Sequence, residues 1–159
     1  PRSSAASDVY KRQLLAGAEW WFLERLEYEG ALLTVEVTEG IVADKPQDVT
    51  IEGAGSVSGA SAIEVTPQSR HVRIEFGGVL AYQVTDESYA AAEYGATQDG
   101  VLALHDNSAY LQHVLEQSLI PDLVDDTVHH YSLGLADDII DIITTKPPKL
   151  MSFTPNSNP

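Results

Sequence analysis

The chain has 159 residues, of which 43% are hydrophobic and 8% aromatic, enough for one ordinary hydrophobic core. Its 9 basic and 24 acidic residues give a formal charge of -15, which argues against nucleic acid as a partner. The absence of cysteine excludes disulfides, thiolate metal sites and a cysteine nucleophile. No apolar run approaches the roughly 20 residues of a membrane helix and no signal-peptide pattern is present, so we expect a cytoplasmic protein with no membrane partner.

The first thirteen residues look foreign to the domain that follows. The run from Ser3 to Gln13 resembles, residue for residue, the translation of a transposase-type sequencing adapter. We therefore expect native sequence to begin at about Leu14. Met151 is the only methionine, so we also expect part of the native N-terminus to be missing. Residues 1–13 hold three basic residues and one acidic residue, so 6 basic and 23 acidic residues remain without them, a charge of -17. The acidic character therefore belongs to the domain itself.

The N-terminal part of the domain reads mainly as strands. Residues 14–24 have a helical composition, but the apolar block 20–23 is also consistent with the start of a strand, and we leave both open. Apolar and polar residues then alternate on both sides of Gly30, which predicts a β-hairpin. Short β-branched runs at 48–53 and 62–66 predict two further strands, separated by a loop rich in Gly, Ala and Ser.

Two more strands are predicted on either side of Gly77 and Gly78. In the first, at 70–75, apolar and polar residues alternate as in a half-buried strand. The second covers 79–84, and the two glycines between them predict a bulge or a tight turn. Residues 86–100 are acidic and rich in Ala, Tyr and Gly, which predicts an irregular connection.

One helix is predicted at about 108–119. Ser108 is a good N-cap, apolar residues follow at helical spacing, and Pro121 prevents continuation. A last hairpin covers 130–145, and its second strand should be central because isoleucines occupy both of its faces. Asp141 lies among these isoleucines and needs a partner, since an unpaired buried carboxylate is costly.

These elements together predict an α+β fold. We expect a mostly antiparallel sheet of about five to seven strands, packed by the one main helix at about 108–119. A single domain should span residues 14–150, and residues 151–159 have the composition of a flexible tail.

Histidines and aspartates supply one candidate site, for metal-dependent or acid–base chemistry. Its members are His105, Asp106, His113, His130 and Asp141. They would act together only if the fold gathers them in one pocket with shifted pKa values. Neighbouring histidines such as His129 and His130 point to opposite faces of a strand, and no metal-binding motif or Gly-x-Ser-x-Gly elbow is present. We therefore assign no catalytic residue, metal or cofactor.

Acidic residues near the end of the helix and at the last hairpin turn supply a second candidate site, for a protein partner. They are Glu116, Asp122, Asp125, Asp126, Asp137 and Asp138. Their spacing lacks the order of a calcium-binding loop. It also suits turn residues and a solvated face with no partner at all.

The last hairpin carries a resemblance to a group of proteins. The stretch from His129 to Pro148, preceded by Val79–Tyr82 and Ser108–Leu111, resembles small uncharacterised bacterial proteins, some of which look like immunity proteins of toxin loci. The matching residues look structural, so no catalytic residue is carried over. The resemblance implies a small acidic module that binds a basic protein, because complementary charge speeds and orients association.

Three hypotheses therefore stand side by side. The first is an acidic, immunity-like binding module, although an acidic surface also arises as an adaptation for solubility. The second is a metal-dependent or acid–base enzyme that uses the His and Asp cluster. The third is a structural subunit whose sheet is completed by a partner strand, which an exposed apolar patch near residues 20–23 would favour.

Overall fold

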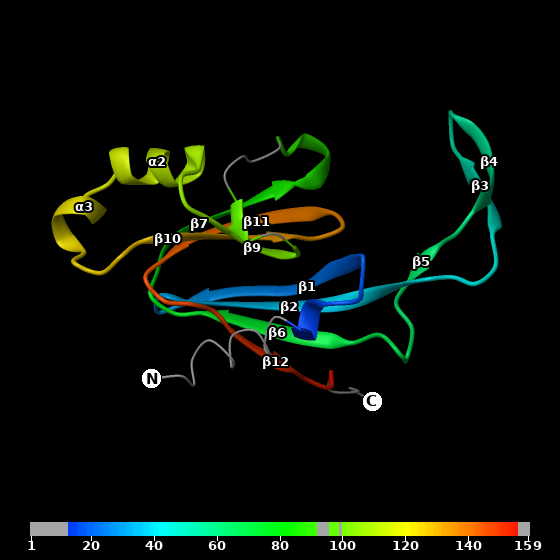
Figure 1. The fold of residues 1–159 in the computed structure, drawn as a ribbon. Coiled ribbons are helices and arrows are strands. Elements are labelled where there is room, and N and C mark those ends of the chain that lie inside the picture. Colours follow the sequence, from blue (N-terminus) through cyan, green and yellow to red (C-terminus); the bar gives the residue numbers. More distant parts are fainter. Residues whose placement is uncertain (1–12, 92–95, 99, 156–159) are drawn as a thin grey trace.

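A computed structural model describes residues 13–91, 96–98 and 100–155 of the chain. These ranges consist mostly of antiparallel strands with one main helix, which confirms the predicted α+β class. The expected count of about five to seven strands is too low, because twelve strands form three sheets within the described ranges (Figure 1). The adapter-like segment, residues 1–13, lies outside the described residues apart from Gln13.

The first sheet contains five strands in antiparallel pairs. In order across the sheet they are β1 (Trp20–Glu29), β2 (Leu32–Val42), β6 (His71–Phe76) and β12 (Lys149–Ser152), with β5 (Ile63–Glu64) paired to the end of β2. β1 and β2 form the predicted hairpin, and its turn places Gly30 and Ala31 at φ angles of 55° and 63°. Two positive φ angles match the twist of the flanking strands, and glycine adopts the first without strain.

The second sheet also contains five antiparallel strands. In order they are β7 (Val79–Asp86), β11 (Asp138–Thr144), β10 (His129–Gly134), β9 (Leu102–His105) and β8 (Ala96–Gln98). β10 and β11 form the predicted last hairpin, and β11 is central, as its isoleucines indicate. Sequence reasoning does not find β8 and β9, because both are too short to show a clear period.

The third sheet is a two-stranded arm that projects from the body of the protein (Figure 1). It consists of β3 (Gln47–Ile51) and β4 (Gly55–Ala60). β4 lies in the segment predicted as a loop, so that prediction is wrong. Pairing with β3 holds these small residues in a strand despite their weak β propensity.

The hydrophobic core lies between the two five-stranded sheets, which face each other (Figure 1). Its largest side chains are fully buried and come from both sheets: Trp21, Leu33, Ile74, Phe76, Leu133, Ile140 and Ile142. The expected core between one sheet and the helix is therefore replaced by sheet-on-sheet packing. The helix instead covers the outer face of the second sheet.

The described ranges contain four helical segments, one before β1 and three in the connections between strands. They are η1 (Gln13–Leu15), η2 (Glu87–Tyr89), α2 (Ala109–Glu116) and α3 (Ile120–Leu123). α2 is the predicted helix, and Ser108 caps it as expected by accepting a hydrogen bond from the Leu111 N–H. It ends at Glu116, three residues earlier than predicted, because the chain turns there into α3. Within the part of the chain that the structure describes, no helix has the length and apolarity to cross a membrane.

The chain crosses between the two sheets at two neighbouring places. β6 leads to β7 through Gly77 and Gly78, the predicted tight turn, and β11 leads to β12 through residues 145–148. Gly78 has a φ angle of 64°, and a Cβ atom there would lie 2.6 Å from Thr145 Oγ1, so the position requires glycine. Thr144 Oγ1 donates a hydrogen bond of 2.7 Å to the Gly77 carbonyl, which joins the two crossings.

Both ends of the domain differ from the simplest expectation. Residues 14–24 begin with a 3₁₀ turn and continue as strand from Trp20, so the apolar block 20–23 is the start of a strand and not part of a helix. β12 continues through Ser152, two residues into the predicted tail, because Met151 and Ser152 pair with β6. Residues 156–159 lie outside the described residues.

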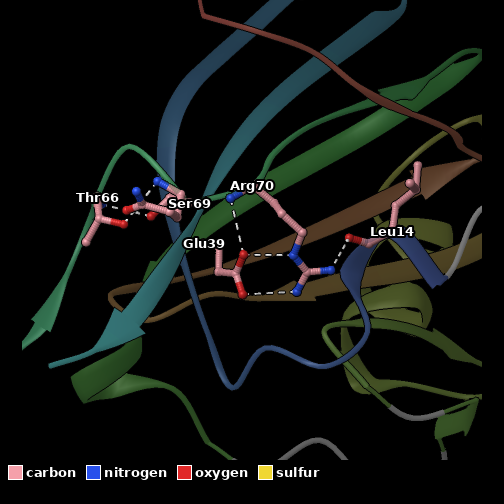
Figure 2. A network of polar contacts seen from close by, with 6 residues as sticks. Leu14, Glu39, Thr66, Ser69 and Arg70 are labelled. Atoms are coloured by element: carbon pink, nitrogen blue, oxygen red, sulfur yellow. Dashed lines mark hydrogen bonds and ion pairs between the residues drawn. The ribbon is translucent and has the colours of Figure 1, made fainter. Parts of the chain in front are cut away.

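An arginine network anchors the N-terminal segment to the first sheet. Figure 2 shows Arg70 between Glu39 and Leu14. The guanidinium donates to both carboxylate oxygens of Glu39, at 2.7 and 3.1 Å, and to the Leu14 carbonyl at 3.3 Å. These hydrogen bonds from Arg70 hold the pKa of Glu39 below its ordinary value. In the turn that leads into this site, Ser69 Oγ accepts a hydrogen bond from the Thr66 N–H.

Candidate functional site

A cavity of about 640 Å³ lies on the outer face of the second sheet, between the sheet and α2. We call it the outer cavity. Strands β7, β9, β10 and β11 form its floor, and α2 and residues 89–91 form its walls. Its size is in the range of small-molecule binding sites. The polar side chains that line it include Gln83, His105, Tyr110, His113, Ser132 and Asp141.

The register of the second sheet brings these side chains together. Alternate residues of a strand share a face, so His130 and Ser132 both lie on the outer face of β10. Ser132 is paired with Asp141 of β11, and Asp141 is paired with Gln83 of β7. His130 is paired with His105 of β9 in the adjacent row. Four strands therefore contribute side chains to one polar cluster.

His130 is fully buried and bonded through both ring nitrogens. Its Nδ1 lies 2.5 Å from Ser108 Oγ, and its Nε2 lies 2.8 Å from Asp141 Oδ1. A carboxylate can only accept, so Nε2 carries the hydrogen and donates it to Asp141. Ser108 Oγ is the hydrogen-bond partner of Nδ1 and at the same time accepts from the Leu111 N–H at 3.0 Å.

Ser108, His130 and Asp141 share the composition of a catalytic triad, but the geometry gives Ser108 a positioning role. Ser108 and His130 are both 0% exposed, so a substrate has no access to the hydroxyl. The same oxygen caps α2. The three residues therefore fix the helix and Asp141 to the sheet, with no nucleophile at the surface.

Asp141 is the ionised group of the outer cavity. Its side chain is 15% exposed, and its Oδ2 accepts a hydrogen bond of 3.0 Å from Gln83 Nε2. Burial raises the pKa of Asp141, but the hydrogen bonds from His130 and Gln83 and the nearby imidazoles of His130 and His105 outweigh it and hold the pKa below its ordinary value. The expectation that Asp141 has a partner is confirmed, and that partner is His130.

Aromatic rings surround the His130 side chain. His105 stacks on it with ring centroids 4.5 Å apart, and Tyr110 of α2 meets it edge-on at 5.6 Å. His105 Nε2 lies 2.8 Å from Ser132 Oγ. Burial and, to a smaller degree, the negative charge of Asp141 raise the pKa of Tyr110 to about 12. The Tyr110 hydroxyl therefore stays protonated at neutral pH.

Four of the five residues predicted as one cluster meet at this place. His130 contacts both His105 and Asp141, and His113 lines the same cavity. Asp106 is exposed and is not part of the cavity wall. Among the described residues, no three His, Asp or Glu side chains are arranged to hold a metal ion.

Sequence reasoning does not identify Ser132 or Gln83 as members of this site. Ser132 lies two residues from His130, so the alternation along β10 is a signal that places both on one face. Gln83 carries no such signal, because it reaches Asp141 only through the register of β7 against β11.

The six acidic residues predicted to contact a partner do not form one cluster. Four of them lie in α2, in α3 and in the loop that leads to the start of β10: Glu116, Asp122, Asp125 and Asp126. Asp137 and Asp138 follow the other end of β10. A strand of six residues separates the two groups by about 20 Å.

Charge is distributed unevenly between the two sheets. Residues 79–145, which include every strand of the second sheet, contain nine Asp and three Glu but no Lys or Arg. The arginines of the described ranges lie in the first sheet or next to it, and each is paired with glutamate. These pairs are Arg25 with Glu27 and Glu36, Arg70 with Glu39, and Arg73 with Glu36.

The start of β1 does not offer the apolar patch that a structural subunit would need. Trp21 is buried between the sheets, and its carbonyl accepts a hydrogen bond from the Ala136 N–H of the β10–β11 turn. Phe22 and Leu23 are partly buried, and Trp20 is 37% exposed. The third hypothesis thus lacks its supporting feature at this position.

Comparison of the chain with known protein families, with curated proteins and with solved structures finds no match. Two features of the described residues therefore carry the information on function. They are the outer cavity with its ionised Asp141, and the segregation of charge between the sheets.

Proposed function

We propose that the protein is a binding module that presents the acidic second sheet and its helices to a basic protein. The observation that carries this proposal is the charge segregation: twelve acidic residues and no Lys or Arg lie within residues 79–145. The arginines that could neutralise this surface are engaged by glutamates around the first sheet. The negative field of the second sheet is therefore free to attract a cationic partner.

The same negative field also limits which class of partner can bind. It repels the phosphates of nucleic acid and of anionic membranes, and it attracts the positive groove of a nucleic-acid-binding protein. A toxin nuclease is a partner of this kind, which agrees with the immunity-like resemblance of residues 129–148. The partner-binding surface has two parts, one around α3 and one at the β10–β11 turn, because β10 separates the two acidic groups.

A charge-reversal experiment tests the proposal. The triple variant Glu116→Lys, Asp125→Lys, Asp126→Lys changes exposed acids of the second-sheet half. Its matched control, Glu29→Lys, Glu52→Lys, Glu64→Lys, changes the net charge equally at exposed positions of the first sheet and the arm. Binding to an immobilised oligo-arginine peptide is measured at several salt concentrations.

We expect the first variant to lose about tenfold or more in affinity and to show a shallower salt dependence, while the control stays within about threefold of wild type. Equal losses in both variants would mean that only the net charge matters and would overturn the proposal of a binding surface on the second sheet.

Acid–base catalysis in the outer cavity is the second candidate function. It is favoured by the contact of His105 Nε2 with Ser132 Oγ at 2.8 Å, because a histidine at this distance can act as a base toward a hydroxyl. The charge of Asp141 opposes it, since the cavity wall offers no Lys or Arg among its described residues to stabilise an oxyanion. A fluorophosphonate probe decides the matter: labelling that disappears in Ser132→Ala supports catalysis, and no labelling of the folded protein rejects a serine nucleophile.

A further inference from the structure

We propose that the outer cavity binds an organic cation, an alkylammonium or guanidinium group, with the Asp141 carboxylate as its counter-ion. This inference rests on the proposed function, because it names the chemical group of a basic partner that would enter the second sheet. A free amine or guanidine has the same chemistry, and the experiment below distinguishes the two sources.

Asp141 has acceptor capacity left for such a ligand. Its Oδ1 accepts from His130 Nε2 and its Oδ2 accepts from Gln83 Nε2. Each carboxylate oxygen has two lone pairs, so these two bonds leave an acceptor site on each oxygen. A guanidinium fork or an ammonium matches two such sites on one carboxylate.

The carboxylate is also held in position before any ligand arrives. Residues on both sides of Asp141 support it: His130 is clamped between Asp141 and Ser108, and Gln83 lies in the neighbouring strand. Binding therefore requires little reordering of the counter-ion, which keeps its entropic cost low.

The walls of the outer cavity suit a cation with an apolar stem. Tyr89 lines the cavity, yet the residue is 84% exposed, as expected of a ring at the rim. Tyr110 of α2 also lines the cavity and is partly buried. Aromatic faces attract cations, and the small side chains of Ala90, Ala103 and Ala109 leave room for methylene groups.

The electrostatics of the cavity select against an anion. No Lys or Arg lines it within the described residues, and histidines are the only lining groups there that can gain a positive charge. Burial and, to a smaller degree, the negative charge of Asp141 raise the pKa of Tyr110, so the Tyr110 hydroxyl adds no positive charge that could attract an anion. A divalent metal is a poorer fit, because the described residues supply no group of three ligands.

Small probes of one size and different charge test the inference. Binding of ethylguanidinium, butylammonium, butanol and butanoate is followed by NMR titration of the ¹H–¹⁵N spectrum of the full chain. We expect saturable binding of the two cations and none of butanoate. Saturable binding of butanoate, or binding of butanol as strong as that of butylammonium, would overturn the proposal.

Three variants locate the site. Asp141→Asn should weaken binding of ethylguanidinium by about tenfold or more, whereas Asp106→Asn, which removes an equal charge at an exposed position outside the cavity wall, should leave it within about twofold. Ala90→Trp fills the cavity from an exposed position and should abolish binding without loss of fold. It keeps the proposal testable if Asp141→Asn is unstable. Unchanged binding in Ala90→Trp would overturn the proposal.

Competition with the oligo-arginine peptide separates this inference from the proposed function. If the peptide displaces ethylguanidinium and loses affinity in Ala90→Trp, a partner side chain enters the cavity. If the small cations bind but the peptide neither binds nor displaces them, the ligand is a free amine or guanidine, and the proposed function fails while the cavity site stands. If the peptide binds equally to wild type, Asp141→Asn and Ala90→Trp, and the small cations show no saturable binding, the cavity inference fails while the acidic surface stands.

Discussion

The outer faces of the two sheets use their charged side chains differently. On the first sheet Glu36 lies against both Arg25 and Arg73, and the hollow of about 230 Å³ nearby is lined by both signs of charge. On the second sheet Asp141 accepts hydrogen bonds from His130 and Gln83 instead of pairing with an arginine. The first face pairs part of its acidic charge with arginine, whereas residues 79–145, which hold the second sheet, contain no Lys or Arg. The second face is therefore the better place to look for a binding partner.

The two faces also differ in how much water reaches them. The arginine side chains of the first sheet are between 34% and 53% exposed, whereas His130 is 0% exposed beneath α2. Water screens an exposed ion pair, so its contribution to stability is small. A buried hydrogen-bonded group has no such replacement partner, so its loss is costly. We therefore expect mutations of the buried group on the second sheet to reduce stability more than mutations of the exposed ion pairs on the first.

His130→Ala should have the largest effect. It removes the partner of both Ser108 and Asp141 at a fully buried position, so we expect the free energy of unfolding to fall by about 3 kcal/mol or more. Urea unfolding followed by circular dichroism measures it. His129→Ala is the matched control on the opposite face of β10 and should cost less than about 1 kcal/mol. Equal losses would contradict the importance of the buried group.

Asp141→Asn should come next, with a loss of about 2 kcal/mol at pH 7. The folded pKa of Asp141 is lowered, so its charge stabilises the fold above the ordinary pKa, and this contribution disappears as the pH falls through the folded pKa. The difference between wild type and variant should therefore shrink in urea unfolding below about pH 4. A difference that grows toward acid pH would show that the carboxylate is not stabilised as described.

Glu39→Gln on the first sheet should cost about 1 kcal/mol, because Arg70 is 39% exposed and water replaces part of the lost contact. Its lowered pKa gives the same sign of pH dependence as Asp141, with stabilisation lost toward acid pH. Unfolding at low and high salt provides the check, since added salt should reduce this effect more than that of Asp141→Asn. A loss larger than that of Asp141→Asn would reverse the comparison between the faces.

Glu27→Gln should have the smallest effect, less than about 0.5 kcal/mol, because both members of its ion pair with Arg25 are about half exposed. Thermal unfolding should show nearly the same midpoint as wild type. A large shift would mean that the pairs of the first sheet form a cooperative network with Glu36 rather than independent contacts.

The outer cavity shows where sequence reasoning succeeds and where it stops. Alternation in β6 predicts its buried face correctly, and four isoleucines predict the central position of β11. The need of Asp141 for a partner also follows from its neighbours alone. The identity of that partner does not, because His130 and Asp141 meet through the register of the β10–β11 hairpin.

The packing of two complete sheets also cannot be predicted from the sequence, for a similar reason. Short strands such as β9 and β12 carry too few residues to show a period, so a second complete sheet could not be counted. The block at 20–23 was ambiguous because Trp21 enters the core while its neighbours are only partly covered. Long-range pairing, which local patterns do not encode, decides both cases.

The crossing that returns the chain to the first sheet has a consequence for synthesis on the ribosome. β6 gains its second neighbour only when β12, the last strand, has emerged. The second sheet, which covers the apolar inner face of β1, β2 and β6, is also translated after them. This face therefore stays uncovered until the second sheet has emerged. Truncation before Lys149 would leave the edge of β6 open to strands of other nascent chains, and such products should aggregate rather than persist as folded fragments.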